Sequence, residues 1–302
     1  MDRRTFLSSL GAVGAGVLVP GLTSCAGSRT TRDTTAAMGS ATPAGSVAGA
    51  AADARPAPGV QLYTLRGEMA KDVEGTLARV GALGYQEVEF AGYFDRTPAQ
   101  IRDALAKAGL RAPSSHIPLD ALEGDRQGKT LADAAAIGHQ WIVVPWLAPD
   151  VRKSIDDYKR IATRLNAAAT AATRAGFQFA YHNHDFEITP LEGRVPLEVL
   201  LAETDPALVK IEMDVYWTVK AGGDPLQIFS RFPGRVTMLH LKDSTGAPDH
   251  KMVAVGEGKI DWPTIVARGA AQGVRHAFVE HDNPADPWAS VTTSVGYLKR
   301  MR

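Results

Sequence analysis

Residues 154–182 read SIDDYKRIATRLNAAATAATRAGFQFAYH and contain one complete unit of the expected fold. Apolar residues recur at helical spacing from Ser154 to Ala175, and Gly176 ends the predicted helix. The short apolar run from Phe177 to His182 is typical of a buried strand. A helix that leads directly into a strand is the repeating unit of a parallel sheet, so this stretch predicts an α/β fold.

The same alternation recurs along the chain from Pro58 to Arg302, a span of about 245 residues that suits a barrel. The expected strands are 59–63, 85–90, 111–116, 140–145, 177–182, 208–214, 236–241 and 276–281. The expected helices are 73–83, 98–108, 129–137, 154–175, 196–202, 225–231, 262–271 and 287–298. Eight such units without a dinucleotide-binding glycine motif predict a closed (β/α)8 TIM barrel with its active site at the carboxyl ends of the strands.

The overall charge of the chain narrows the class of substrate. The 302 residues include 33 Lys plus Arg and 33 Asp plus Glu, so the formal net charge is zero. Without a basic excess, nucleic acid is not an expected partner, which argues against a metal-dependent endonuclease on this fold. We therefore expect a neutral, polar small molecule as substrate.

The first 25 residues, MDRRTFLSSLGAVGAGVLVPGLTSC, have the pattern of an export signal. Arg3 and Arg4 resemble a twin-arginine signal, and Cys25 ends a stretch that resembles a lipoprotein cleavage box. Residues 26–57 are rich in Ala, Gly, Ser, Thr and Pro and predict a flexible tether. We therefore expect the domain 58–302 to be exported to the periplasm, with membrane contact only through a lipid on Cys25.

Ionisable side chains occur at the ends of four consecutive predicted strands, at His182, Asp214, His240 and Glu280. Burying such groups without partners is costly, so their recurrence predicts one shared partner. A divalent metal meets this need, because mixed imidazole and carboxylate ligands suit Mn, Zn, Fe or Co better than Ca. Mn is the favoured ion among Mn, Zn, Co, Fe and Mg.

Several motifs resemble one branch of the sugar phosphate isomerase/epimerase superfamily, which has a xylose-isomerase-like TIM barrel. These motifs are residues 59–66, 84–90, 181–187, 240–243, 255–262 and 279–282. The resemblance implies four metal ligands at the ends of strands five to eight, commonly Glu, Asp, His and Glu. Asp214, His240 and Glu280 match the last three, whereas His182 replaces the first Glu. His184 is the alternative ligand, because strand residues two apart share a face.

The resemblance also implies the reaction, which is proton transfer on a sugar or keto-sugar through an enediolate, as in an isomerase or epimerase. Related epimerases use two metal-bound glutamates as bases, and Glu280 is the one retained here. The second base would come from His184, Glu187 or Glu89, and Lys242 would steady an enolate oxygen or protonate a leaving group. The missing carboxylate favours the alternative of a lyase or dehydratase that eliminates the β substituent of a 3-keto-glycoside.

Aromatic and polar residues near the strand ends complete the expected substrate site. Tyr63, Trp146 and Trp217 are candidates for stacking on sugar faces. Glu89 and His116, at the ends of the second and third predicted strands, are candidates for contacts with sugar hydroxyls. The alternative from another class is a non-catalytic sugar-binding lipoprotein, which would bind metal without exchanging substrate protons.

Overall fold

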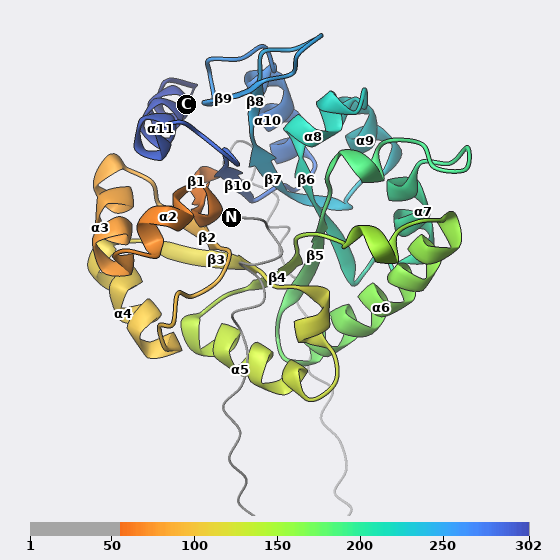
Figure 1. The fold of residues 1–302 in the computed structure, drawn as a ribbon, viewed down its shortest axis with the longest axis horizontal. Helices are drawn as coiled ribbons and strands as arrows, with labels where there is room; N and C mark the ends of the chain where they lie inside the picture. The colour runs from red at the N-terminus through yellow and green to blue at the C-terminus, as the bar shows by residue number, and fades with distance from the viewer. Residues whose placement is uncertain (1–54, 302) are drawn as a thin grey trace, which may run out of the picture. The chain divides into compact units, whose positions relative to one another are not determined.

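In the computed structural model, the described residues are 55–301. Within this range, parallel strands close into one eight-stranded barrel in the order β1-β10-β7-β6-β5-β4-β3-β2. Helices surround the barrel and connect each strand to the next (Figure 1). The predicted (β/α)8 TIM barrel is therefore confirmed.

The bounds of the elements follow the predicted alternation. The barrel strands are β1 (Ala57–Gln61), β2 (Glu87–Phe90), β3 (Arg111–His116), β4 (Trp141–Val144), β5 (Gln178–His182), β6 (Val209–Asp214), β7 (Val236–Leu241) and β10 (His276–Val279). The outer helices are α3 (Val73–Leu83), α4 (Pro98–Ala108), α5 (Arg126–Ile137), α6 (Ile155–Arg174), α7 (Pro196–Glu203), α9 (Pro225–Arg231), α10 (Trp262–Ala271) and α11 (Pro287–Met301).

Local signals at the helix ends explain why these bounds were predictable. The Thr97 side chain accepts a hydrogen bond from the Gln100 backbone N–H, and the Gln100 side chain accepts one from the Thr97 N–H. Pro98 occupies the first turn of α4, where its missing N–H costs nothing. Gly109 ends the helix with φ of 65°, a conformation that favours glycine.

Three predicted strand ends are wrong. β1 covers Ala57–Gln61 instead of 59–63, and Tyr63 lies in the 3₁₀ helix Leu62–Leu65 that follows. The Gln61 side chain accepts a hydrogen bond from the Tyr63 N–H and so starts this helical turn. β4 ends at Val144 instead of 145, and β10 ends at Val279 instead of 281, so Trp146 and Glu280 lie in the loops that follow these strands.

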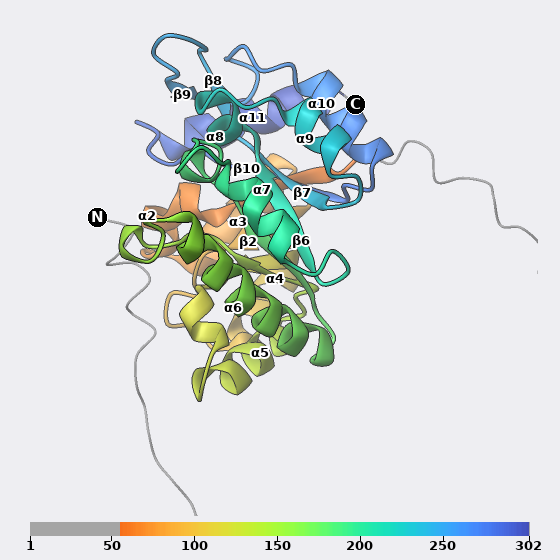
Figure 2. The ribbon, with the colours of Figure 1, turned by 90° about the vertical axis from the view of Figure 1, so that its right-hand side faces the viewer.

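The structure adds short elements that the apolar pattern did not predict. These are α2 (Arg66–Met69) after β1, α8 (Val215–Lys220) after β6, and the antiparallel pair β8 (Asp243–Ser244) and β9 (Met252–Val253) after β7. They follow the carboxyl ends of barrel strands and lie on the same side of the barrel (Figure 2). These elements therefore border the end of the barrel where an active site is expected.

The interior of the barrel is apolar only in part. A large apolar core fills the space between the sheet and the surrounding helices. Inside the barrel, a separate small cluster contains Trp141, Val143, Ala180, Met238 and Phe278. Closer to the carboxyl ends of the strands, the inward-facing side chains are charged or polar, and they form the candidate site described below.

The expected export signal, lipidation site and tether lie outside the described residues, apart from the last three tether positions. At the end of that predicted tether, β1 begins at Ala57, one residue before the expected start of the barrel domain. Within residues 55–301, none of the helices has the length and apolar character needed to cross a bilayer.

The Thr97 cap supplies a test of the local signals. Thr97→Ala removes a capping hydrogen bond, so the free energy of unfolding should fall by about 1 kcal/mol in urea titrations. Thr163→Ala is the matched control, because Thr163 lies on the exposed face within α6. An equal loss of stability in both variants would contradict the capping role.

Candidate active site

The pairing of β5, β6 and β7 determines which side chains meet inside the barrel. His182 pairs with Glu212, and Asp214 pairs with His240. Alternate residues of a barrel strand face the interior, so Glu212 and Asp214 both point inward, two residues apart along β6. His182 therefore lies level with Glu212, and the backbone of His240 lies level with Asp214, one layer nearer the carboxyl ends of the strands.

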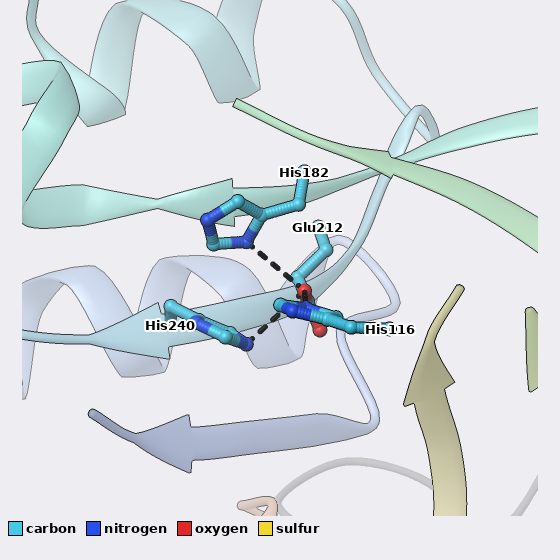
Figure 3. Close-up of side chains that lie close together, drawn as sticks. All are labelled: His116, His182, Glu212 and His240. Atoms are coloured by element: carbon cyan, nitrogen blue, oxygen red, sulfur yellow. Dashed lines mark hydrogen bonds and ion pairs between the residues drawn. The ribbon is translucent and has the colours of Figure 1, made fainter. Parts of the chain in front are cut away.

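The deeper layer gathers imidazoles around one carboxylate oxygen. Glu212 Oε2 lies 2.9 Å from His116 Nε2, 3.0 Å from His182 Nδ1 and 3.1 Å from His240 Nε2. Figure 3 shows the three rings around the Glu212 carboxylate. The strands β3, β5, β6 and β7 each contribute one of these side chains.

Glu89 from β2 extends this layer. Its Oε2 lies 3.0 Å from His116 Nε2 and 2.7 Å from His240 Nε2, and it accepts a hydrogen bond from Gln61 Nε2 at 2.7 Å. We call Glu89, His116, His182, Glu212 and His240 the inner cluster. Both carboxylates are fully buried, so their charge must be balanced within the protein.

A second group lies nearer the carboxyl ends of the strands and centres on Lys242. Its Nζ lies 2.8 Å from Asp214 Oδ2, 2.8 Å from Glu280 Oε2 and 2.9 Å from Asp282 Oδ1. We call Asp214, Lys242, Glu280 and Asp282 the outer cluster. His240 joins the two groups, because its Nδ1 lies 2.8 Å from Glu280 Oε2.

The four predicted metal ligands lie together in the structure. One ligand atom each from His182, Asp214, His240 and Glu280 falls within 4.8 Å of all the others. They are not at one depth, because His240 pairs with Phe278 and Glu280 lies two residues further along. A second set within the same distance contains His116, Glu212, His182 and His240.

His182, rather than His184, belongs to both sets. The ring of His184 stacks on Phe186 with centroids 5.4 Å apart and lies 5.6 Å from the ring of Trp217. The ring centroids of His182 and His184 are 5.0 Å apart. His184 therefore borders the site from the loop after β5.

The chemistry of the two clusters fits a divalent metal. Glu89 Oε1 and Glu212 Oε1 are buried and accept no hydrogen bond from the described residues. Buried carboxylate oxygens are normally satisfied by a donor or a cation. Together with the imidazole nitrogens, they make a donor set that suits a transition metal.

The charges of the neighbours shift the pKa values of the histidines in opposite directions. Burial, followed by the charge of His240, holds the pKa of His182 well below its usual range. Burial alone would lower the pKa of His116, but Glu89 and Glu212 raise it to about 9. Burial opposes the charged form of His240 too, yet Glu212 and hydrogen bonds to Glu280 and Glu89 raise its pKa.

Burial and neighbouring charges also shift the pKa values of the carboxylates. Burial alone would raise the pKa of Glu89. The charge of His116 and hydrogen bonds from His116 and His240 outweigh burial, so the pKa is lowered. For Asp214, burial raises the pKa and outweighs the lowering effect of Lys242. Proton positions in the two clusters are therefore coupled through His240.

Glu187, a predicted candidate for the second base, has both carboxyl oxygens engaged. The Tyr181 hydroxyl lies 2.5 Å from Oε1, and the His184 backbone N–H donates to Oε2 at 2.7 Å. Burial raises the pKa of Glu187 to about 8. This environment suits a residue that holds the His184 backbone in place better than one that accepts a substrate proton.

The three predicted stacking residues surround the strand ends at different places. Trp217, in α8, is half-buried, and its ring lies 5.7 Å from Lys242 Nζ. Tyr63 is half-buried beneath the Arg66 guanidinium, 4.1 Å from its ring. Trp146 is half-buried beyond β4. Of the three predicted stacking residues, Trp217 is therefore the one whose ring lies beside Lys242 of the outer cluster.

Glu212 and Asp282 were not among the predicted site residues. Glu212 precedes Asp214 by two residues in the same predicted strand, so the strand period alone indicates that both face the barrel interior. Asp282 follows Glu280 by two residues and lies beyond the end of β10. No local signal in the sequence indicates that Lys242 lies between Asp214, Glu280 and Asp282, because these contacts join distant parts of the chain.

Comparison with known proteins identifies the family. Residues 77–300 match the xylose isomerase-like TIM barrel family, and this chain belongs to that family. The resemblance inferred from the motifs is therefore confirmed.

Curated relatives carry the name inosose dehydratase. The protein from Geobacillus kaustophilus is 25% identical over 214 residues, which cover 64% of this chain and 68% of that protein. The protein from Lacticaseibacillus casei is 34% identical over 88 residues, which cover only 29% of either chain. Both of these relatives are named as dehydratases.

Solved structures show the same fold. A sugar phosphate isomerase/epimerase from Parabacteroides distasonis is 26% identical, with a TM-score of 0.70 over 82% of this chain and 95% of that one. An L-ribulose 3-epimerase, at 15% identity and a TM-score of 0.60, shares the fold.

The buried carboxyl of Glu187 predicts a pH-dependent stability. Its pKa is about 8 in the folded chain and near its ordinary value of 4.5 when unfolded, so the folded state binds more protons between these values. Stability should therefore fall with rising pH across this window, by up to ~1.4 kcal/mol per pH unit. Glu187→Gln cannot ionise and should gain stability relative to the unmodified protein from pH 4.5 to 8.

Denaturant titrations at several pH values measure this difference. Glu203→Gln is the control, because Glu203 is exposed at the end of α7. A stability difference between Glu187→Gln and the unmodified protein that stays constant from pH 4.5 to 8 would show that Glu187 ionises normally in the fold.

Proposed function

We propose that this chain is a divalent-metal-dependent enzyme that removes a proton next to the carbonyl of a carbohydrate ketone and then eliminates the β substituent. The observation that carries the proposal is the contact between Lys242 Nζ and Glu280 Oε2, at 2.8 Å. It places a carboxylate base beside an ammonium acid within a buried site. An elimination needs one group of each kind.

The steps assign one role to each side chain. Glu280 Oε2 accepts the proton from the carbon next to the carbonyl, and the electron pair of that C–H bond forms an enediolate. The C–O bond at the β carbon then breaks, and Lys242 donates a proton to the departing oxygen. Asp214 and Asp282, at 2.8 and 2.9 Å from Nζ, keep the Lys242 side chain charged and oriented.

A bound divalent metal would polarise the carbonyl and stabilise the negative charge of the enediolate. The residues available to hold it are the histidines and carboxylates of the inner and outer clusters. The partnerless Oε1 atoms of Glu89 and Glu212 support the presence of a cation among them.

Elimination suits this site better than epimerisation. Epimerisation needs bases on both faces of the substrate carbon, and the family resemblance implies a pair of carboxylates for this task. His182 occupies the position of the first carboxylate. Of the three candidates for a second base, Glu89 and Glu187 are held by hydrogen bonds to neighbouring side chains and backbone. The third, His184, is an imidazole stacked on Phe186 and not a carboxylate. The name of the curated relatives, inosose dehydratase, supports the same choice.

Isomerisation is the second candidate, supported by the likeness to the Parabacteroides distasonis protein named sugar phosphate isomerase/epimerase. It shares the first proton transfer and differs in the fate of the enediolate, which is reprotonated instead of losing a substituent. A substrate panel of free sugars, 3-keto-glycosides and inosose, followed by NMR in D₂O with Mn²⁺, separates the two outcomes. Deuterium incorporation without elimination identifies the isomerase.

Substitutions at the acid and the base should affect different steps. Glu280→Gln removes the base and should lower both deuterium exchange and product formation by about 10²–10⁴-fold. Lys242→Met removes the acid, so it should lower elimination while exchange into the substrate continues. NMR of the substrate in D₂O measures exchange and elimination in one sample.

Glu203→Gln serves as the control for these variants, since it changes an exposed carboxylate on α7. Full exchange in Glu280→Gln would exclude Glu280 as the base. Metal binding without exchange on any substrate in the panel would support the non-catalytic sugar-binding protein instead.

We further propose that the chain is exported and anchored by a lipid on Cys25, as the signal-like residues 1–25 suggest. Expression in a bacterium that processes lipoproteins should place the protein in the detergent phase after Triton X-114 partition. Cys25→Ser should shift it to the aqueous phase. Equal partition of the two proteins would contradict lipidation at Cys25.

A further inference from the structure

We propose that the metal ion binds in the inner cluster, held by His116, His182, Glu212 and His240, and that the outer cluster remains an acid–base layer without an ion. This inference rests on the proposed function in one respect, since it assumes a metal-dependent reaction. It assigns a different ligand set from the His182, Asp214, His240 and Glu280 that the strand ends and the family resemblance predict.

The position of Lys242 argues against an ion in the outer cluster. Its ammonium nitrogen lies 2.8 Å from both Asp214 Oδ2 and Glu280 Oε2. These two carboxylates are the ones that the expected outer site would use. A divalent ion held by them would lie close to the Lys242 charge in a buried site, where repulsion between like charges is poorly screened.

The inner cluster has no lysine or arginine charge beside its carboxylates among the described contacts. These two carboxylates, Glu89 and Glu212, are fully buried. Three imidazole nitrogens crowd around Glu212 Oε2 while Glu212 Oε1 has no hydrogen-bond partner in the described chain. A hydrogen-bonded network would spread its donors over both oxygens.

The spacing of these atoms also suits ligation. Adjacent ligand atoms that lie ~2.1 Å from one ion are ~3.0 Å apart in octahedral geometry and ~3.4 Å apart in tetrahedral geometry. The distances from Glu212 Oε2 to the nitrogens of His116, His182 and His240 are 2.9, 3.0 and 3.1 Å. These distances are compatible with a shared ion, and the ligand atoms of all four residues lie within 4.8 Å of one another.

The two shared histidines explain how one ion serves both layers. His182 directs Nδ1 to Glu212 and Nε2 towards Asp214, and His240 directs Nε2 to Glu212 and Nδ1 to Glu280. A neutral imidazole has one lone pair and one N–H. If the inner nitrogens bind the ion, the outer N–H groups are available to donate to the outer carboxylates.

In this arrangement, Glu280 is not a ligand of the ion. The ion pair with Lys242 and the contact with His240 both favour the charged form of Glu280, but direct ligation to a divalent ion would occupy one of its lone pairs and weaken it further as a base. The same imidazole connects the base to the ion, so the metal and the base remain coupled without sharing an oxygen.

Metal affinities of matched variants test the assignment. Mn²⁺ binding is measured by isothermal titration for the unmodified protein, for His116→Ala and Glu212→Gln in the inner cluster, and for Asp214→Asn and Glu280→Gln in the outer cluster. The inner variants should weaken binding by at least about 100-fold. The outer variants keep a hydrogen-bond acceptor and should stay within about tenfold, the lower range for residues that only support a ligand.

A larger loss in the outer variants than in the inner ones would overturn the assignment, and so would equal losses in both. X-ray absorption of the Zn²⁺-loaded, unmodified protein gives a second readout that does not depend on variants that fold. Three imidazole ligands are expected, and two would favour the outer set.

These outcomes are distinguishable from failure of the proposed function. Metal bound by the outer set overturns the inner assignment but leaves proton exchange and elimination in place. Loss of exchange in Glu280→Gln with unchanged Mn²⁺ affinity supports both proposals. An unmodified protein that binds neither Mn²⁺ nor Zn²⁺ overturns the metal dependence itself.

Discussion

Buried negative charge at the carboxyl end of the barrel is the constraint on which the rest of the site depends. Glu89, Glu212 and Asp214 are fully buried, and Glu280 is 4% exposed, so water cannot solvate their charges. Removing such groups from water is costly unless positive charge or hydrogen-bond donors replace the water. Lys242 supplies that charge in the outer cluster, and in the inner cluster the imidazoles approach the carboxylates at hydrogen-bond distance. A metal ion in the inner cluster would complete the balance.

The closed barrel makes this concentration of charge possible. Each strand sends alternate side chains inward, and the stagger between neighbouring strands arranges them in layers. An apolar layer that includes Trp141 and Phe278 fills the middle of the barrel. The charged layers lie beyond it, against the loops and short elements that follow the strands. The apolar layer beneath and the added elements α8 and β8–β9 surround the charges, which strengthens every electrostatic interaction among them.

The family fold and the contacts of Lys242 together support the proposed reaction. The chain belongs to the xylose isomerase-like TIM barrel family, and ionisable side chains that could hold a metal lie together near the strand ends. The family resemblance implies a carboxylate at the position of His182, and Lys242 Nζ lies 2.8 Å from Glu280 Oε2. A site with one carboxylate base beside an ammonium acid suits the proposed elimination better than exchange of protons on two faces. Deeper binding of the metal would leave Glu280 without a direct bond to the ion.

Local interactions in the sequence determined the succession of strands and helices, the caps such as Thr97, and the polar residues that end consecutive strands, because periodicity and capping depend on neighbours along the chain. The same local logic could have found Glu212, two residues before Asp214. Only the tertiary structure decided that Tyr63 enters a helical turn, that Lys242 lies between acids from two other strands, and that His116 meets Glu212. The physical reason is that these contacts depend on the register between strands, which closure of the whole barrel sets.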